Sequence, residues 1–297
     1  MRSGLAITAG WAADQLLGEP PTRYHPVAWF GKTMQRLEKT TYRDARTAGA
    51  IHTAVGVAIG VGVGRVATKI LGRLVATAAA VAICVAGRML ADEASKIIDA
   101  VEDGDLDTAR QRLPTLVGRE TADLTEPEIL RAVIESVAEN TNDAVIASIF
   151  WATIGGAPAV LAHRAINTLD AMIGHRNQRY DNFGWAAARL DDLANYLPAR
   201  IGALGIALLA PHRAHEIHRA VREDAPKHPS PNGGVIEAAV AAALDIELGG
   251  INRYDDRIED RGTLGGTRIP TTTDAREAIK LTNRLGVLAA TIASAKW

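Results

Sequence analysis

Acidic and amide side chains crowd the segment "EPEILRAVIESVAENTNDAV", immediately before residues 144–162, which contain no Asp, Glu, Lys or Arg. With 100° between successive helical residues, these side chains share one face, opposite an apolar face: Glu135, Glu139, Asn142 and Asp143. Their carboxylate and amide oxygens could bind Mg²⁺ or accept a proton. A solvated helix face is the alternative interpretation, because Arg131 lies four residues before Glu135 and could pair with it.

Two further polar stripes follow the uncharged run. The segment "HRAINTLDAMIGH" places three polar residues on one helical face: His163, Asn167 and Asp170. In "GWAAARLDDLANYLPARI", one face carries Trp185, Arg189, Asp192 and Tyr196, and a neighbouring face carries Asp191 and Asn195. Polar side chains beside lipid-facing segments are costly unless they meet one another or line a cavity. We therefore expect one shared polar pocket at the membrane surface, suited to Mg²⁺ and phosphate rather than Zn²⁺, with solvated helix faces as the alternative.

A weaker candidate lies in "HPSPNGG", which predicts a turn followed by an apolar helix over residues 235–244. Backbone N–H groups at the start of that helix could hold an anion. A plain loop is equally compatible with the same residues.

Long apolar helices must position these stripes, because helical periodicity dominates the chain and no convincing alternating strand pattern occurs. Residues 144–162 could span a bilayer, which takes about 20 mostly apolar residues. Residues 47–64, apart from His52, and 74–87 are also uncharged, and shorter apolar stretches cover 201–210 and 285–295. The predicted fold class is all-α: a multi-pass integral membrane helical bundle with polar extramembrane helices and loops.

Glycines recur every four residues in the first long apolar segment, at Gly56, Gly60 and Gly64. Such small residues let membrane helices touch backbone to backbone. The next segment has a matching small face: Gly72, Ala76, Ala80 and Cys84. A soluble helical core and a nucleotide-binding loop are alternatives, although no strand precedes the glycines. We predict a single membrane-embedded domain over residues 1–297 that includes a polar helical segment at about 92–140.

The amino-acid composition argues against several classes of function. The 297 residues carry a formal net charge of -1, so no basic field favours nucleic acid. Apolar residues make up 47% of the chain but aromatic residues only 4%, which suits closely packed helices. Cys84 is the single cysteine, so disulfides within the chain and thiolate metal clusters are excluded.

Five motifs together identify a resemblance that runs from about Asp14 to Gly266. They are "LGEPPTRYHPVAWFGK", "LVGRET", "ESVAENTNDAVIASIFWATIGG", "NTLDAMIGHRNQRYDNFGWAAARLDDLANYLPARI" and "SPNGG…LGG…Y". In this order they resemble the adenosylcobinamide-phosphate synthase (cobinamide synthase, CobD/CbiB) family of cobalamin biosynthesis. Two positions depart from the family pattern: Glu19-Pro20 replaces Asp-Pro, and Gly233-Gly234 replaces Ala-Gly.

The resemblance implies a multi-pass membrane enzyme. It would ligate (R)-1-amino-2-propanol or its O-phosphate to the propionate carboxylate of adenosylcobyric acid, with ATP as co-substrate and Mg²⁺. Its partners would be the corrinoid and amine substrates, the lipid membrane, and possible further copies of itself or other corrinoid-pathway enzymes. We expect a location in the cell membrane.

Together with the chemistry of amide formation, the resemblance suggests three groups of site residues. The expected catalytic residues are Glu135, Glu139, His163 and His25. The expected substrate-binding residues are Asn140, Asn167, Arg164, Arg176, Arg189, Ser230 and Asn232. The expected metal ligands are Asp143, Asp170, Asp191 and Asp192.

Two other classes of function stay open at this point. A non-enzymatic membrane subunit could scaffold corrinoid enzymes, and it would need an exposed interaction face but no intact acid and Arg stripes. A soluble all-α enzyme could use Asp-rich helices to bind Mg²⁺ and a diphosphate, but the all-round apolar residues 53–64 argue against it.

Overall fold

The computed structural model describes residues 2–175, 177–254 and 257–295 of the chain. They divide into two compact units, each described by itself below. The first consists of Met1–Ala86, Asp143–Asn195 and Ala289–Trp297, and the second of Gly87–Asn142 and Tyr196–Leu288.

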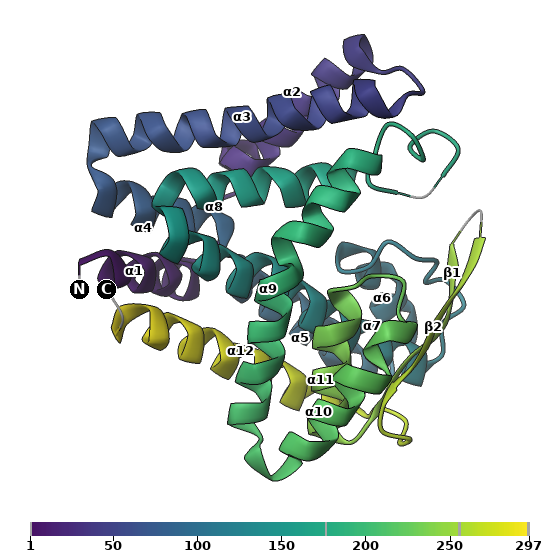
Figure 1. The fold of residues 1–297 in the computed structure, drawn as a ribbon. Coiled ribbons are helices and arrows are strands. Elements are labelled where there is room, and N and C mark those ends of the chain that lie inside the picture. The colour runs from purple at the N-terminus through teal and green to yellow at the C-terminus, as the bar shows by residue number, and fades with distance from the viewer. Residues whose placement is uncertain (1, 176, 255–256, 296–297) are drawn as a thin grey trace. The chain divides into compact units, whose positions relative to one another are not determined.

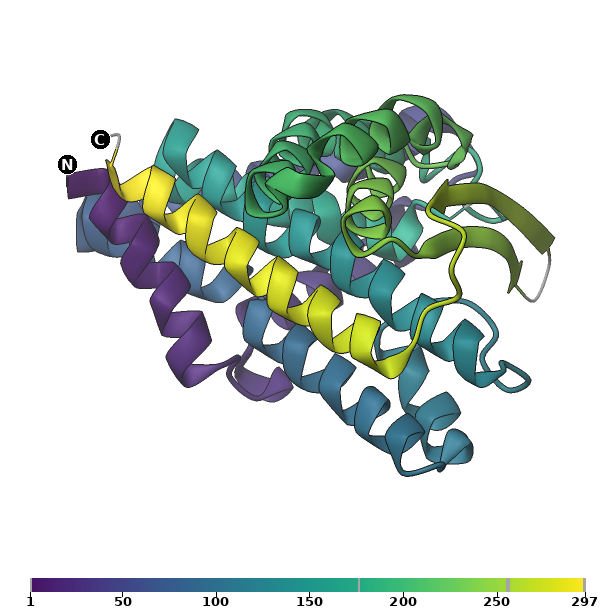
Figure 2. The ribbon, with the colours of Figure 1, turned by 90° about the horizontal axis from the view of Figure 1, so that it is seen from below.

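Helices build the first unit (Figure 1). They are α1 (Arg2–Leu17), α2 (Pro26–Thr41), α3 (Arg46–Leu71), α4 (Arg73–Cys84), α8 (Ala147–Ile173), the start of α9 (Trp185–Leu209) and the end of α12 (Thr272–Ala295). Figure 2 shows the end of α12 beside α1, where Thr8 Oγ1 donates to the carbonyl of Ala290 at 3.1 Å. An apolar cluster lies between α2, α8 and the residues that follow α8: Met34, Leu169, Ile173, Phe183 and Ala187.

Three glycines let α3 approach α8 closely. A Cβ added at Gly60 would lie 2.6 Å from the carbonyl oxygen of Leu161, and one at Gly64 would lie 2.5 Å from Cα of Pro158. The predicted backbone-to-backbone packing at this ladder is therefore confirmed, and its partner is α8. The glycines face α8 and not the small residues of α4, because the spacing of small residues defines a flat face without specifying what covers it.

The second unit combines helices with a β-hairpin (Figure 1). Its helices are α5 (Gly87–Glu102), α6 (Leu106–Arg112), α7 (Glu126–Asn140), α10 (Ala214–Glu223) and α11 (Gly233–Leu244), with the remainders of α9 and α12. A capping box at Thr125 and Glu128 starts α7, as the sequence predicts. Helix α11 is buried from Gly233 to Ala242 and contacts α7, α10 and both strands.

The hairpin was not predicted. Strand β1 (Glu247–Tyr254) pairs antiparallel with β2 (Arg257–Gly265), and the register shifts between Gly249 and Ile251. Gly249 and Gly250 have positive φ angles of 83° and 78°, so the backbone departs from a regular strand at this point. Such an irregular strand lacks the alternating pattern on which sequence recognition of strands depends.

Three helical segments are long and apolar enough to cross a membrane: Arg46–Leu71, Arg73–Glu102 and Glu126–Ile173. A fourth is possible if the bent pair Trp185–Leu209 and Pro211–Lys227 counts as one span. The predicted helical fold class with membrane-spanning segments is confirmed, with the hairpin as an addition.

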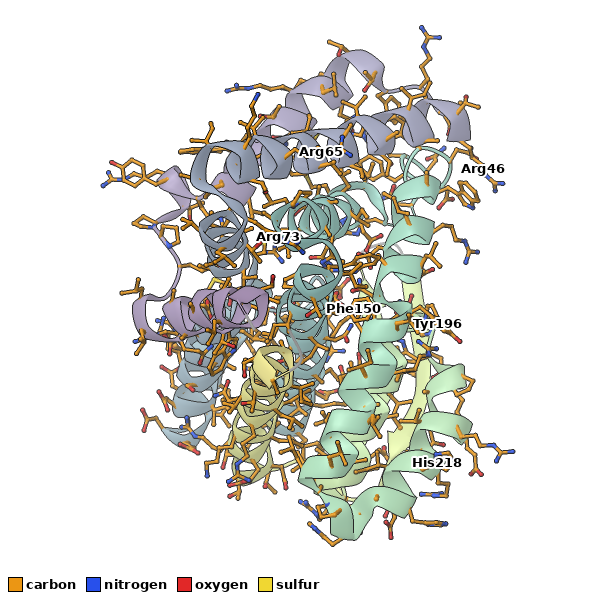
Figure 3. The ribbon with its side chains drawn as sticks, turned by 60° about the vertical axis from the view of Figure 1, so that its left-hand side comes forward. Arg46, Arg65, Arg73, Phe150, Tyr196 and His218 are labelled. Carbon is orange, nitrogen blue, oxygen red and sulfur yellow. The ribbon has the colours of Figure 1, made fainter. Side chains whose placement is uncertain are left out.

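Helix α3 is the most exposed of these segments, since only 17% of its apolar window is buried in the protein. Figure 3 shows Arg46 and Arg65 on this helix, and both side chains are exposed. At 1.5 Å per residue they are about 28 Å apart along the axis, close to the roughly 30 Å of a hydrocarbon layer. The exposed valines and isoleucines between them therefore suit lipid better than water.

Candidate functional site

The first unit contains a hydrogen-bonded cluster of acids and amides. The side-chain nitrogen of Asn167 on α8 donates to Asp143 Oδ2 at 3.3 Å and to Asp191 Oδ1 at 3.5 Å. Asn195, one turn further along α9, donates to Asp191 Oδ2 at 3.0 Å. The ring Nε2 of buried His163 lies 2.9 Å from Asn195 Oδ1. The first unit thus gathers members of the first two predicted polar stripes, together with the two residues of the face beside the third stripe.

A π-helical turn, Thr141–Ile146, separates α7 from α8 and carries Asp143. A regular α-helix through Asp143, which the spacing of these residues predicts, would keep Asp143 on the face of Glu135 and Glu139. The i→i+5 bonds of a π turn insert extra residues into the helix and rotate everything that follows. Asp143 belongs to the first unit and the two glutamates to the second, so a single helical face does not describe them.

The Asp143–Asn167–Asp191 group has the right chemistry for Mg²⁺. Two carboxylates converge on one amide group, and Mg²⁺ is commonly held by one or two carboxylates together with substrate phosphates and water. Within the described residues, no group of three or more His, Cys, Asp and Glu side chains could hold a metal ion. The residues therefore fit a metal that arrives with a phosphate better than a closed structural site.

The other two predicted metal ligands have different surroundings. The carboxylate of Asp170 lies against Gly174, where an added Cβ would meet Oδ1 at 1.9 Å. Asp192 Oδ2 lies 3.7 Å from Nη1 of Arg189, whose side chain is exposed. Metal binding by these two aspartates, and substrate binding by Arg189, stay predictions.

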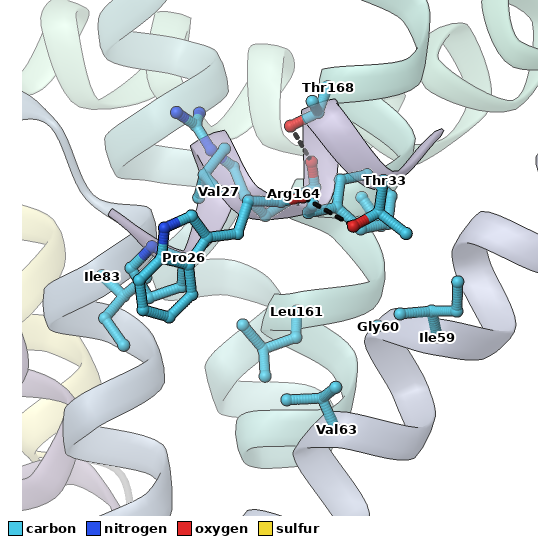
Figure 4. Close-up of a pocket in the computed structure, with 13 residues that line it drawn as sticks. Pro26, Val27, Thr33, Ile59, Gly60, Val63, Ile83, Leu161, Arg164 and Thr168 are labelled. Atoms are coloured by element: carbon cyan, nitrogen blue, oxygen red, sulfur yellow. Dashed lines mark hydrogen bonds between the residues drawn. The ribbon is translucent and has the colours of Figure 1, made fainter. Parts of the chain in front are cut away.

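A separate apolar cavity of about 400 Å³ lies in the first unit, lined by α2, α3, α8 and Ile83 of α4 (Figure 4). Among the described residues, Arg164 is the one charged residue that lines this cavity, and its Nη1 also donates to Asn167 Oδ1 at 3.3 Å. His25 caps α2 by accepting from the N–H of Val27, and its Nε2 is 3.8 Å from Glu19. Burial and the positive charge of Arg164 lower the pKa of His25, which keeps its ring neutral.

The second unit contains a polar pocket of about 100 Å³. Its polar lining comes from α7, the hairpin and the segment before α7: Arg119, Glu135, Ser136, Glu139, Asn252 and Arg261. The predicted catalytic residues Glu135 and Glu139 therefore share one small space. It can admit a single small group of a substrate but not a corrin ring.

Both carboxylate oxygens of Glu135 are occupied by the protein. Oε2 accepts from Arg119 Nη1 at 2.9 Å, and Oε1 accepts from the N–H of Gly249 at 2.9 Å. Nε of Arg131 lies 3.7 Å from Oε1, as the sequence spacing predicts. Both oxygens of Glu135 therefore already accept hydrogen bonds from the protein.

Arg119 uses only one corner of its guanidinium. Nη1 bonds both Glu135 and Asn252 Oδ1, whereas Nε and Nη2 are buried with no partner among the described residues. The side-chain nitrogen of Asn252 is likewise buried and unpaired within the described chain. Arg119 is 9% exposed and Asn252 2% exposed, so water supplies little compensation.

A buried acid on α11 lies next to this pocket. Glu237 is 0% exposed, and its Oε1 lies 3.7 Å from both Nη1 of Arg261 and Nε2 of His228. Burial raises the pKa of Glu237 well above its usual range, and the carboxylates of Glu135 and Glu139 add to the rise. Burial, with a smaller effect of Arg261, lowers the pKa of His228 to about 4.

The "SPNGG" segment forms the start of α11. Ser230 Oγ accepts from the N–H groups of Asn232 and Gly233, at 3.3 and 3.0 Å, and Asn232 Oδ1 accepts from Arg200 at 3.1 Å. A Cβ on Gly233 would lie 3.2 Å from Glu139 Oε1, so this segment borders the polar pocket. Substrate binding by Ser230, Asn232 and the exposed Asn140 stays a prediction, and Arg176 lies outside the described residues.

Sequence reasoning missed five polar residues of the second unit, namely Arg119, His228, Glu237, Asn252 and Arg261. One signal was available: Glu237 is the single charged residue in the apolar helix "GGVIEAAVAAAL", and an isolated charge in such a setting is usually functional or paired. Asn252 and Arg261 could not be found, because the hairpin that carries them was not predicted.

Known proteins resemble this chain over almost its whole length. The family model described as "CobD/Cbib protein" matches residues 7–282. A protein named "Cobalamin biosynthesis protein CobD" from Mycobacterium tuberculosis is 46% identical over 295 residues, covering 97% of this chain and 94% of the relative. A protein of the same name from Chromobacterium violaceum is 40% identical, with 96% and 93% covered. No solved structure matches the chain significantly.

Proposed function

Because the chain belongs to the CobD/CbiB family and has a role in cobalamin biosynthesis, we propose that it is an amide-forming ligase. The proposed substrates are (R)-1-amino-2-propanol, or its O-phosphate, and the propionate carboxylate of adenosylcobyric acid. ATP is consumed, and the product is adenosylcobinamide or its phosphate. The family resemblance of the motifs around Arg119, Glu139 and Asp191 supports this activity.

The proposed chemistry has two steps, because a free carboxylate is a poor acyl donor. A propionate oxygen attacks the terminal phosphorus of ATP, so an acyl phosphate forms and ADP leaves. The amine nitrogen then attacks the acyl carbon; the carbon–nitrogen bond forms, the carbon–oxygen bond breaks and phosphate leaves. A base must remove a proton from the amine.

The observation that carries the proposal is the polar pocket of the second unit, where carboxylates and guanidinium groups surround one small space. We assign Glu139 as the proton acceptor, because both oxygens of its neighbour Glu135 are engaged by Arg119 and Gly249. Arg261 lines the same pocket and can stabilise negative charge on the acyl oxygen or the leaving phosphate.

The acid and amide cluster of the first unit is proposed to hold Mg²⁺. Asp143 and Asp191 would be its protein ligands, and Asn167 would orient them. When bound, the metal supplies charge that neutralises phosphate oxygens during transfer. Arg164 donates to Asn167 and so fixes the orientation of the amide that touches both carboxylates.

The test is conversion of adenosylcobyric acid by purified protein in detergent with ATP, Mg²⁺ and either amine, followed by mass spectrometry of the corrinoid. We expect an amidated product, one ADP for each amide bond, and none without ATP. Glu139→Gln should lower kcat at least a hundredfold, in the range that general-base catalysis supplies. Glu126→Gln, at an exposed acid on the same helix, is the matched control.

Absence of any ATP-dependent product from correctly folded wild-type protein would overturn the proposed activity. Equal turnover by the Glu139 and Glu126 variants would leave the activity in place but remove Glu139 as the base.

A further inference from the structure

Arg119 lines the polar pocket of the second unit and is hydrogen-bonded within the described chain through one corner of its guanidinium, so that its other edge (the open edge, Nε and Nη2) is unpaired. Nη1 makes both of its side-chain hydrogen bonds within the described residues, to Glu135 Oε2 at 2.9 Å and to Asn252 Oδ1. Nε and Nη2 are buried without a partner in the described part of the chain. Leaving a buried donor of a charged group unpaired is costly, so this arrangement calls for a ligand or an ordered water.

The geometry of the open edge specifies the ligand. Nε–H and one N–H of Nη2 point in parallel from a planar guanidinium, which matches two oxygens of a carboxylate or phosphate. The unpaired side-chain nitrogen of Asn252 is a third donor at the same pocket, where Asn252 Oδ1 bonds the other corner of the guanidinium, Nη1 of Arg119. Three donors without acceptors favour an oxyanion over a cation or an apolar group.

The neighbouring contacts hold the open edge in place. Glu135 is fixed by the N–H of Gly249 at 2.9 Å and approached by Arg131 at 3.7 Å, so it can hold Arg119 in one orientation. Gly118 also lines the pocket, which leaves room beside the guanidinium. The space of about 100 Å³ suits one small charged group. Glu135 and Glu139 already bring carboxylates to this pocket. An additional oxyanion is tolerable there only because the positive charges of Arg119 and Arg261 line the same pocket.

We propose that the Arg119 edge and the Asn252 amide form an oxyanion-binding subsite for a carboxylate or phosphate group of a substrate. This inference rests on the proposed function for the identity of the substrates, but not for the existence of the subsite. The oxyanion has two possible sources: the phosphate of the amine substrate and a peripheral carboxylate of the corrinoid. Both offer the same pair of oxygens to the guanidinium.

Binding of inorganic phosphate tests the subsite without requiring activity. Titration calorimetry would use purified full-length protein in Mg²⁺-free buffer, so that binding through the proposed metal ligands does not contribute. Arg119→Lys keeps the charge but loses the two-pronged edge, and we expect phosphate affinity to fall at least tenfold. Asn252→Asp keeps the oxygen that bonds Arg119 and replaces the donor by an acceptor, with the same expected loss. Arg253→Lys, at an exposed arginine of the same strand, is the control and should bind normally.

Kinetics distinguish the two sources. If the oxyanion belongs to the amine, both variants raise KM for aminopropanol phosphate at least tenfold, leave KM for adenosylcobyric acid within twofold, and remove any preference for the phosphorylated amine. If it belongs to the corrinoid, KM for adenosylcobyric acid rises instead, and inorganic phosphate competes with the corrinoid.

Wild-type phosphate binding and wild-type values of both KM in folded Arg119→Lys and Asn252→Asp proteins would overturn the subsite. Weakened phosphate binding in a protein whose wild type forms no amide would uphold the subsite and refute the proposed reaction. Asn252→Asp keeps the outcome decisive if Arg119→Lys fails to fold.

Discussion

Adjacent residues in this protein have very different surroundings, and Asp191 and Asp192 are the clearest case. Asp191 accepts hydrogen bonds from Asn167 and Asn195, at 3.5 and 3.0 Å. Asp192 pairs at 3.7 Å with Arg189, whose side chain is exposed. Successive helical residues point 100° apart, so one can face a polar cluster while the next faces away.

This difference gives a matched pair of substitutions. If Asp191 holds Mg²⁺ and phosphate, Asp191→Asn should lower kcat about a hundredfold or more, since loss of one charged group at a transition state costs about 3 kcal/mol. Raised Mg²⁺ should restore part of the activity. Asp192→Asn, on the neighbouring face of the helix, is the comparison in the same ligation assay. Loss of activity in Asp192→Asn alone would move the metal site to the neighbouring face.

His228 should make folding stability depend on pH. Its pKa is lowered from 6.5 to about 4 by burial, so the unfolded chain binds a proton between these values while the folded protein does not. The stability contribution is therefore present above pH 6.5 and is lost as pH falls toward 4. Between pH 7 and pH 5 the loss is about 2 kcal/mol.

The measurement is the free energy of unfolding in detergent at pH 7 and pH 5, for wild type and His228→Gln. The variant should lose about 2 kcal/mol less than wild type over this range. Raised pKa values such as that of Glu237 act in the opposite direction, and they are present in both proteins. Identical pH dependence of the two proteins would contradict the neutral, buried state of His228.

At the scale of helices and strands, the spacing of nearby residues predicted local features of the elements, but it did not predict which elements contact one another. Three features that depend on residues close together in the sequence are present as predicted. They are the capping box at Thr125, the glycine ladder on α3 and the apolar run of α8. The hydrogen bond from Arg119 to Asn252 joins residues 133 positions apart in the sequence. Asn252 lies on a strand whose glycines interrupt any alternating pattern. Periodicity carries no information on such a long-range contact.

The glycine ladder predicts how two Gly→Ala substitutions in α3 affect stability, and one of them is the control for the other. Gly60→Ala would place a Cβ 2.6 Å from the carbonyl oxygen of Leu161, so α3 and α8 must separate, and we expect clear destabilisation of about 1 kcal/mol or more. Gly62→Ala has nothing within 4 Å of the added Cβ and should be neutral or stabilising, because alanine favours helix. Thermal unfolding in detergent distinguishes them, and equal melting temperatures would contradict the close α3–α8 contact.

For the whole molecule, the exposed apolar surface of α3 places the chain in a membrane. Only 17% of its apolar window is covered by protein, although the segment is 26 residues long. Carbonate washing of membranes should therefore leave the protein in the pellet. Release into the supernatant would contradict the membrane-spanning assignment of this helix.

The orientation of the chain follows from the proposed substrates, since ATP is found in the cytoplasm. Asn182, in the loop after α8, donates to Asp44 at 3.0 Å, so this loop lies at the Arg46 end of α3. Gln178→Cys in this loop should resist a membrane-impermeant thiol reagent in intact cells and react after permeabilisation. Lys69→Cys, near the other end of α3, should react in intact cells, because a spanning helix puts its two ends on opposite sides. Cys84 is 0% exposed and gives little background. Ready labelling of Gln178→Cys from outside would reverse the proposed orientation, and equal labelling of both variants would contradict the crossing itself.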